Sequence, residues 1–277
     1  MGQPVAAIGD NTIDLYLGLD SYSFVGGNAV NVAIQITRLG RPARYFGAIG
    51  PDAAGQQVRA ALVSREVDVR GLIELPGRTS TSRIRVDDTG VRHFESEDFG
   101  VCERYRPDEE ALERAAECGA AHIGLMPGAE PVRRFLARRG VLVSQDCGVT
   151  LRPRGYRWMG VAFCSQEAAG LPADKIAADA VGGGAALAVV TCGEAGSVAF
   201  DGQTTWRVSA VPVAVVDTTG AGDAYAAGFL DARLAGADVD QAMGAAAAHA
   251  AKACTHFGAW PQEPGPAAAI SPPGAPR

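Results

Sequence analysis

The chain has 277 residues, of which 47% are hydrophobic, and it carries a formal net charge of −6. This length and apolar content suit one large α/β domain, whereas the acidic balance argues against a nucleic-acid surface, which needs clustered Lys and Arg. No stretch reaches the roughly 20 apolar residues of a membrane span. The six cysteines are scattered without a C-x-x-C pair, so we expect a reduced, cytoplasmic protein without a zinc site.

The first predicted strand covers residues 4–8 (PVAAI), and Asp14 lies just past its end. Ligands of open α/β sheets bind at the carboxyl ends of strands. Asp14 can therefore face a substrate, although a solvated turn is the more common place for a lone Asp.

A helix is predicted next, from the Gly-Gly pair at 26–27 to about Leu39, with Gly40 as its stop signal. Asn28 suits the helix cap. Asn31 lies one turn later, where an Asn side chain usually points to water.

A second strand and helix, over residues 44–49 and 55–65, continue the β-α-β rhythm of a parallel, doubly wound sheet. The pattern then changes to two short strands with alternating polar residues, 81–86 and 91–95, joined by the hairpin signal Asp-Asp-Thr-Gly. Alternation implies one wet face, so we predict a small sheet that stands off the main one.

Three acidic residues, Glu95, Glu97 and Asp98, are predicted to follow this hairpin directly. The common interpretation of such a run is a solvated acidic turn. The alternative is an acidic rim that faces a cationic substrate.

The rest of the chain continues the alternation of strands and helices. Further strands are predicted over residues 121–125, 141–145, 161–164, 186–191 and 198–200. Further helices are predicted over residues 107–118, 130–139 and 241–256. His249 lies on the last of these, where we predict a side chain packed in the core or at the surface rather than a catalytic one. Residues 261–277 are rich in Pro, Gly and Ala without periodicity, and we expect them to be disordered.

The most informative stretch is residues 217–230, DTTGAGDAYAAGFL. The valine-rich run before it, residues 211–216, predicts a buried strand, and the run after it predicts an amphipathic helix. A strand, a glycine turn and a helix start together predict an anion site, because the first N–H groups of a helix lack partners. Gly220 and Gly222 also carry no Cβ that would hold a phosphate off the backbone.

Asp223 stands at the start of this helix, where the macrodipole should keep its carboxylate ionised. An ionised acid beside a phosphate site suits a base that takes the proton from an attacking hydroxyl. Capping the helix is the simpler role for an Asp at this place. The adjoining glycine turn favours the chemical role.

The DTTGAGD motif and its helix resemble the C-terminal signature of the phosphofructokinase-B, or ribokinase-like, sugar kinases. GGNAVNVA at 26–33 is similar to their N-terminal signature, and the resemblance extends over residues 4–260. It implies a ribokinase-like three-layer α/β/α sandwich with a mainly parallel central sheet and a small β lid. It also implies that Asp223 is the catalytic base, in an anion hole formed by Gly220, Ala221 and Gly222.

The resemblance assigns further residues by their match to family positions. The sugar would be bound by Asp14, Gly27, Asn28 and Asn31. The nucleotide would lie along a Thr-x-Gly-x-x-Gly turn that contains Thr191, Gly193 and Gly196.

Two segments depart from the family pattern. Glu167 would reach Mg²⁺ through water, but Cys164 stands where the family has Asn. Asp146, followed by Cys147 and Gly148, replaces an Asp-Pro-Asn-like motif. The first departure weakens the metal role of Glu167, and the second leaves generic sugar or phosphate contacts at Asp146 open.

Within the family, GDNTIDLY, ESEDFGV, TCGEAGS and HFGAW look most like bacterial members that phosphorylate the 6-hydroxyl of fructoselysine. Fructoselysine is an Amadori product, a fructose joined through C1 to a lysine amine that is cationic near neutral pH. Glu97 is the expected contact for this amine. The alternatives are a kinase for another Amadori compound, a kinase for fructose, ribose or a nucleoside, and a catalytically silent sugar or nucleotide sensor.

The resemblance implies ATP and Mg²⁺ as cofactors, a small sugar as substrate, and no nucleic-acid or membrane partner. Activation by a monovalent cation stays open, and a homodimer paired through the lid is a family-level expectation. We expect one kinase domain over residues 1–260, with the lid built from about 12–25 and 79–97.

Overall fold

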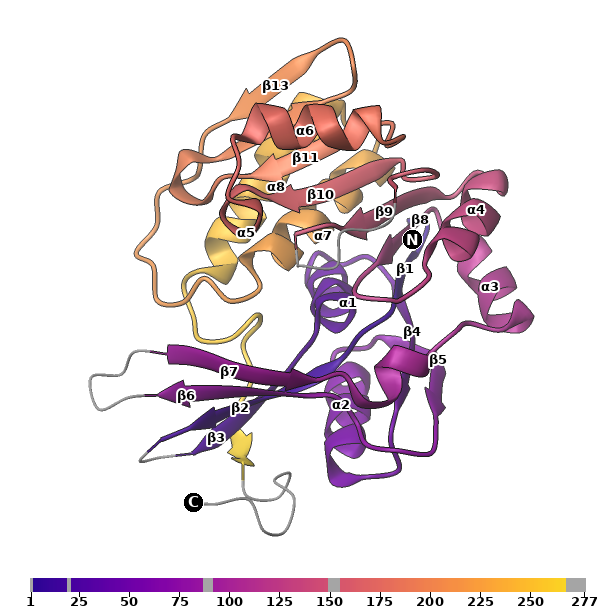
Figure 1. Cartoon of the computed structure of the whole chain (residues 1–277), viewed down its shortest axis with the longest axis vertical. Helices are drawn as coiled ribbons and strands as arrows, with labels where there is room; N and C mark the ends of the chain where they lie inside the picture. Colours follow the sequence, from indigo (N-terminus) through magenta and orange to yellow (C-terminus); the bar gives the residue numbers. More distant parts are fainter. Residues whose placement is uncertain (1, 19–20, 87–91, 149–154, 268–277) are drawn as a thin grey trace.

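The computed structural model describes residues 2–18, 21–86, 92–148 and 155–267. In this part of the chain, a central sheet of nine strands runs in the order β13-β12-β11-β10-β9-β8-β1-β4-β5 (Figure 1). The bounds of these strands, in the same order, are Thr205–Val208, Ser197–Phe200, Ala188–Thr191, Val161–Ser165, Leu142–Asp146, Ala120–Ile123, Val5–Ile8, Ala43–Ile49 and Asp68–Glu74. All pairs from β11 to β5 are parallel, and β12 is antiparallel to both of its neighbours. The predicted mainly parallel sheet is confirmed.

Helices cover both faces of this sheet. One face carries α1 (Asn28–Arg38), α2 (Ala53–Ser64), α7 (Ala221–Leu234) and α8 (Val239–Ala253). The other carries α3 (Glu109–Ala116), α4 (Glu130–Arg138) and α6 (Ala173–Gly182). The short helices are α5 (Gln166–Ala169), η1 (Gly100–Arg104) and η2 (Gly193–Ala195). The result is the three-layer α/β/α sandwich that the family resemblance implies.

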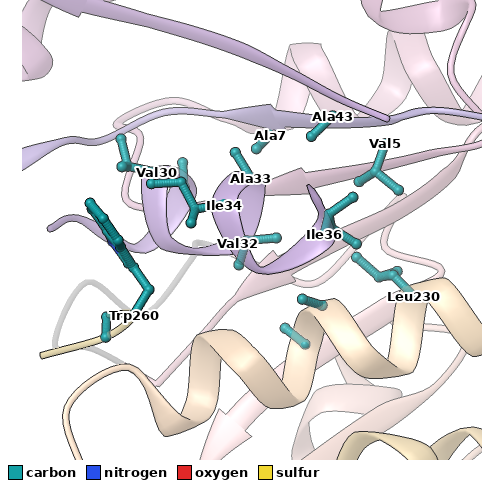
Figure 2. Close-up of a cluster of buried hydrophobic side chains, with 14 of the residues drawn as sticks. Val5, Ala7, Val30, Val32, Ala33, Ile34, Ile36, Ala43, Leu230 and Trp260 are labelled. Atoms are coloured by element: carbon teal, nitrogen blue, oxygen red, sulfur yellow. The ribbon is translucent and has the colours of Figure 1, made fainter. Parts of the chain in front are cut away.

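Strand β1 shows why the sheet is covered twice. Its side chains alternate, so Val5 and Ala7 pack into the cluster below α1 and α7, whereas Ala6 and Ile8 pack into the cluster below α3 and α4. Figure 2 shows Val5 and Ala7 between the sheet and α1, with Leu230 of α7 closing the same cluster. All of these apolar side chains are buried, so the sheet and α1 form one rigid support for the residues at their ends.

Helix α1 ends where the sequence predicts. Its last helical residue is Arg38, and Gly40 follows with φ 83°, a conformation that glycine adopts without a Cβ penalty. The N–H of Gly40 donates to the carbonyl of Thr37 at 2.8 Å, which closes the helix.

A second sheet stands off the central one, as predicted, and is called the lid here (Figure 1). Its strands, in spatial order, are β14 (Gly265–Pro266), β3 (Tyr22–Gly26), β2 (Thr12–Leu17), β6 (Thr81–Val86) and β7 (Arg92–Asp98). Strands β6 and β7 are antiparallel, and their predicted turn lies outside the described residues.

Two predictions about the lid need correction. The acidic residues 95–98 do not follow its hairpin but belong to β7 itself, because pairing with β6 continues to Asp98. The segment after Trp260 is not wholly without structure, since Gly265 and Pro266 pair with β3. Residues 268–277 lie outside the described part of the chain.

The valine-rich run at 211–216 is not the buried strand that its composition predicts. It forms no ladder, and its valines are exposed, with Val215 at 63%. Pro212 has no N–H to donate to a neighbouring strand, and the N–H of Val216 donates instead to the carbonyl of Cys254 at 2.8 Å. The run is therefore a connection between β13 and the glycine turn.

Within the described ranges, no helix is both long and apolar enough to cross a bilayer.

Candidate active site

The site lies where strand order reverses. Strand β1 pairs with β4 on one side and with β8 on the other, and the chain leaves β1 next to the start of α1. Crevices at such switch points, outside the carboxyl ends of parallel strands, are the usual ligand sites of open α/β sheets.

Asp10, just after β1, forms hydrogen bonds with two other segments at this switch point. Its buried carboxylate accepts the N–H of Asn28 at 2.7 Å and of Ala29 at 3.4 Å, both at the start of α1. It also accepts the N–H of Leu125, which follows β8, at 2.8 Å. Burial raises the pKa of Asp10, and these N–H bonds lower it. Asp10 thus satisfies the first N–H groups of α1, and the predicted cap role of Asn28 is wrong, because Gly27 occupies the N-cap position and Asn28 makes no capping bond.

Gly27 is held in a conformation that needs glycine. Its φ is 99°, and a Cβ here would lie 2.5 Å from the Cα of Asn11. This close approach brings the start of α1 against the loop after β1, so that Asn28 is placed at the switch point.

Asp223 lies in the first turn of α7, which packs against α1. Its carboxylate accepts the Nδ2 of Asn28 at 2.6 Å and the Nδ2 of Asn31 at 2.7 Å. Asp223 is not the helix cap, because Gly220 holds that position. Asn31 does not point to water either, since it is buried and bonded to Asp223. The two asparagines form one cluster with Asp223, although each of them is 192 or more positions away from it in sequence.

The pKa of Asp223 is raised to about 7, above its usual 3.8. Burial is the main cause, and the nearby charges of Asp146 and Asp10 add to it, whereas the bonds from Asn31 and Asn28 lower it. With this pKa the carboxyl group is only partly ionised at neutral pH, whereas the helix dipole alone predicts an ionised group. The side chain is deep in the protein but keeps partial exposure, and a carboxyl group with a pKa near 7 suits proton transfer at neutral pH.

The glycine turn before Asp223 has room for an anion. Gly220 has φ 72°, and a Cβ there would lie 2.3 Å from the Cβ of Ala259, whereas nothing lies within 4 Å of a Cβ at Gly222. The N–H of Ala221 already donates to the carbonyl of Thr218 at 3.1 Å. The N–H groups of Gly220 and Gly222 find no acceptor within the described part of the chain. Two of the three amides predicted for the anion hole are thus available.

Asp217 holds this turn, and the sequence analysis did not assign it a role. Its Oδ1 accepts from the N–H and the hydroxyl of Thr219 at 3.0 and 2.8 Å. Its Oδ2 accepts from the N–H of Gly258 at 3.0 Å. An Asp that bonds the backbone two residues on is a known turn signal, so the first contact was predictable, but the tie to Gly258 was not.

The lid contributes a row of polar side chains on one face. Asp14 on β2, Ser82 on β6 and Glu97 on β7 are register neighbours across three adjacent strands, so their side chains share a face. The pKa of Asp14 is raised to about 7, chiefly by burial, with further increases from the charges of Glu97 and Asp10. The charge that acts on Asp14 from Asp10 comes from outside the lid, from the loop after β1.

The three acidic residues of β7 have different surroundings. Glu95 is exposed and pairs with Arg85 at 3.4 Å. Asp98 accepts the N–H of Gly100 at 2.9 Å. Glu97 is half-buried, and its pKa is raised by burial and by the charge of Asp10. Of the three, Glu97 is the one placed to meet a ligand.

Five carboxyl groups on these elements each lie close enough to another of the five for its charge to act on them: Asp10, Asp14, Glu97, Asp146 and Asp223. The pKa of each is raised by burial, to about 6 for Asp146. None of the five forms a salt bridge with a residue in the described ranges. Such a site favours hydroxyl donors and a positive charge over an anionic sugar.

The predicted nucleotide residues lie in the hairpin from β11 to β12. Gly193 and Gly196 have φ 57° and 95°, and a Cβ at Gly196 would lie 2.1 Å from the carbonyl oxygen of Val208. The hydroxyl of Thr191 donates to the carbonyl of Cys164 at 3.3 Å. The glycines are needed for the turn itself, which is compatible with a nucleotide role and does not require one.

Glu167 is exposed in the first turn of α5, and Ser165 caps this helix by accepting the N–H of Ala168 at 3.3 Å. Cys164 is buried at the end of β10. Among the residues that the structure describes, no group of three or more His, Cys, Asp or Glu side chains is arranged to hold a metal.

Two histidines are buried near α1. His249 bonds the Oε1 of Gln35 at 3.0 Å, which confirms the predicted packed role, and burial lowers its pKa to about 4. His122 on β8 bonds the Oδ1 of Asn28 at 2.9 Å and so reaches the site. No signal in the sequence pointed to His122, because it is a single polar residue inside a predicted strand.

Comparison with known proteins agrees with this geometry. The model of the pfkB family carbohydrate kinases matches residues 22–123 and 162–264. Fructoselysine 6-kinase of Escherichia coli strain K12 is 34% identical over 268 residues, which cover 92% of this chain and 99% of that protein. A fructosamine kinase of Bacillus subtilis strain 168 is 29% identical over 262 residues, 92% of each chain.

The fold has the same relatives. The structure of Arabidopsis thaliana ribokinase complexed with ribose and ATP superposes with a TM-score of 0.85 at 22% identity, covering 93% of this chain and 94% of that one. The matched residues include the start of α1 and the turn before α7, whose residues meet at Asp223, and they also include the hairpin after β11. The chain therefore belongs to the pfkB family of carbohydrate kinases.

Proposed function

We propose that this kinase transfers a phosphoryl group from ATP to the 6-hydroxyl of fructoselysine or a closely similar Amadori product. The observation that carries the chemistry is the carboxyl group of Asp223, which has a pKa of about 7 and belongs to a partly exposed residue at the start of α7 beside an open glycine turn. Support for the substrate comes from the similarity to fructoselysine 6-kinase along nearly the whole chain.

Asp223 is the proposed general base. At neutral pH about half of its carboxyl groups are ionised, so it can take the proton of a sugar hydroxyl and later release it. The amide nitrogens of Asn28 and Asn31 each use one hydrogen on Asp223 and have a second for a sugar hydroxyl. Gly27 brings the α1 backbone to the sugar, and Asp14 on the lid accepts further hydroxyl hydrogens.

We place the part of the site that binds the anionic phosphoryl group at the turn before α7. The free N–H groups of Gly220 and Gly222 donate to the charged oxygens at the reacting centre, where the helix start also favours negative charge. ATP with Mg²⁺ supplies the phosphoryl group when bound. The residues that would hold the nucleotide and its ion are Thr191, Gly193, Gly196 and, through water, Glu167.

The amine of the substrate is proposed to meet the lid. Glu97 and Asp14 share one lid face, and the charge of Glu97 raises the pKa of Asp14, because like charges repel. A secondary ammonium group placed between them would relieve this repulsion, whereas a plain sugar hydroxyl would not. The acidic lid face therefore supports an Amadori product over neutral fructose.

The test is an ADP-release assay with ATP and Mg²⁺ on fructoselysine, an α-fructosyl amino acid, fructose, ribose and adenosine. We expect the highest kcat/KM on fructoselysine. A preference for a neutral sugar or for adenosine would keep the kinase and reject the Amadori substrate. ATP binding without turnover on all five would reject this substrate class and favour a sensor.

We also propose a cytoplasmic location and a homodimer that pairs through the lid, which stands clear of the central sheet (Figure 1). Light scattering on the purified protein measures the dimer directly. The same preparation, assayed with and without K⁺, answers whether a monovalent cation activates.

A further inference from the structure

A line of four side chains runs from the central sheet to Asp223. Ser144 on β9 and His122 on β8 are register neighbours with no solvent exposure, and the Ser144 Oγ lies 3.0 Å from the His122 Nδ1. The His122 Nε2 lies 2.9 Å from the Asn28 Oδ1. The Asn28 Nδ2 lies 2.6 Å from the Asp223 carboxylate. The sheet interior is thus connected to the proposed base by hydrogen bonds alone.

The direction of each bond follows from chemistry. An ionised Asp223 only accepts, so Asn28 must turn its Nδ2 to the acid and its Oδ1 to the histidine. His122 must then donate from Nε2. Burial lowers its pKa to about 3, so it is neutral, and its Nδ1 accepts the hydroxyl hydrogen of Ser144. That hydroxyl has one hydrogen, and its other contact, to the carbonyl of Ala121, is longer at 3.4 Å.

Asn31 provides an internal comparison. Its Oδ1 is buried and has no hydrogen-bond partner in the described part of the chain, so only Asp223 orients this amide. The amide of Asn28 is held at both ends. Without His122, the Asn28 amide could rotate and turn its oxygen towards the carboxylate, which would exchange an attraction for a repulsion.

We propose that His122 is a positioning residue, which holds the Asn28 amide with its N–H towards Asp223 and thereby sets the pH range over which Asp223 works as the base. This rests on the proposed function, because it assumes that Asp223 takes the proton of the sugar hydroxyl.

Other titratable groups face Asp223 from neighbouring elements. They are Asp146 at the end of β9 and Asp10 after β1, and the charge of each raises the pKa of Asp223. The ring of His122 lies beside Phe163 of β10, at 6.0 Å between centroids, which carries no charge. The two acids stay in place in a His122 variant, so a change in pH profile reports the bond through Asn28.

The test is the pH profile of kcat/KM for wild type, His122→Leu and His122→Gln. Loss of a hydrogen bond to the charged form raises the pKa of an acid. The acid limb of the profile, the low-pH side on which kcat/KM rises as the base ionises, should therefore move up by about one pH unit in His122→Leu. At pH 7 the ionised fraction of Asp223 would then fall by about fivefold, and kcat/KM with it. In His122→Gln the side-chain amide can donate to Asn28 in place of the imidazole and should restore most of the profile.

His249→Leu is the matched control. His249 is also buried and also bonds a side-chain amide of α1, that of Gln35, but it does not reach Asp223. This variant should lose stability while its acid limb stays that of wild type. In an Asn28→Ala background, His122→Leu should add no further movement of the limb, because its path to Asp223 is already removed.

An acid limb that stays in place in folded His122→Leu would overturn the proposal, as would an equal movement in His249→Leu. If His122→Leu does not fold, Ser144→Ala decides, because loss of the hydroxyl frees the other imidazole tautomer and should move the limb in the same direction by less. Wild-type turnover in Asp223→Asn is a separate result, since it would reject the base itself.

Discussion

Replacing the proposed base by its neutral isostere should make the enzyme slower and the fold more stable. In Asp223→Asn, we expect turnover to fall by about 10²–10⁴-fold, the usual contribution of a general base. ATP should still bind, because Gly220 and Gly222 offer backbone N–H groups that the substitution does not alter. At pH 8 the variant should unfold at a higher temperature than wild type.

The stability gain follows from the raised pKa. The folded-state pKa of Asp223 is about 7 and its usual value is 3.8, a difference of about 3, and each pKa unit corresponds to about 1.36 kcal/mol. Ionised Asp223 therefore costs the folded state at most about 4 kcal/mol above pH 7. The residue is partly exposed, and part of the shift comes from the charges of neighbouring acids. We therefore expect Asp223→Asn to raise the free energy of unfolding by about 2 kcal/mol, which corresponds to about 4–8 °C in melting temperature for a chain of this size.

The sign can be checked with pH. Between pH 3.8 and 7 the folded state holds a proton on Asp223 that the unfolded state has lost, so wild type loses stability as pH rises through this window. The gap between Asp223→Asn and wild type should therefore be widest at pH 8 and should close towards pH 4. The introduced amide also needs an acceptor for its NH₂, and Asn31 can rotate to provide one because its Oδ1 has no partner in the described residues.

Three measurements test this reasoning: kcat by ADP release, ATP affinity by calorimetry, and melting temperature from pH 4 to pH 8. A variant that is less stable than wild type at pH 8 would show that ionised Asp223 is not costly to the fold. Turnover near the wild-type value would remove Asp223 from the mechanism, whatever the stability result.

Three further substitutions address the lid and the glycine turn. Glu97→Gln should raise KM for fructoselysine several-fold more than KM for fructose, since only the Amadori amine carries a positive charge; an equal effect on both, measured by ADP release, would count against a charge contact. Gly220→Ala should lower the free energy of unfolding by about 1–3 kcal/mol, because its φ of 72° and the 2.3 Å approach to Ala259 leave no room for a Cβ. Gly222→Ala, with open space around it, should change stability little in urea unfolding but raise KM for ATP; equal stabilities for the two variants would contradict the geometry.

Local pattern was enough for most of the secondary structure. The apolar spacing of α1 and its stop at Gly40 depend on neighbours within a few residues, and both were predicted. The hairpin of β6 and β7 followed in the same way from alternation, except for its end at Asp98, which is decided by pairing with Thr81 of β6.

The same local reasoning failed where partners are distant. Residues 211–216 have the composition of a buried strand but join no sheet in the described part of the chain, and their valines lie exposed. Gly265 and Pro266 lie in a stretch whose composition predicts disorder, yet they pair with Ser23 and Tyr22 of β3, more than 200 positions earlier in the sequence. The capping of α1 by Asp10 from another loop could not be predicted either, because cap preferences describe residues adjacent to the helix.

The candidate site also has features that the local sequence predicts and features that depend on distant contacts. The turn of Gly220 and Gly222 and an acid at the start of α7 are properties of a few consecutive residues, and the motif sufficed to predict them. The bonds from Asn28 and Asn31, the burial that raises the pKa of Asp223 to about 7, and the support from His122 all depend on α1 packing against α7 and β8. These contacts join positions 94 or more apart, and a carboxyl group's proton affinity depends on what surrounds it in space, which only the folded chain decides.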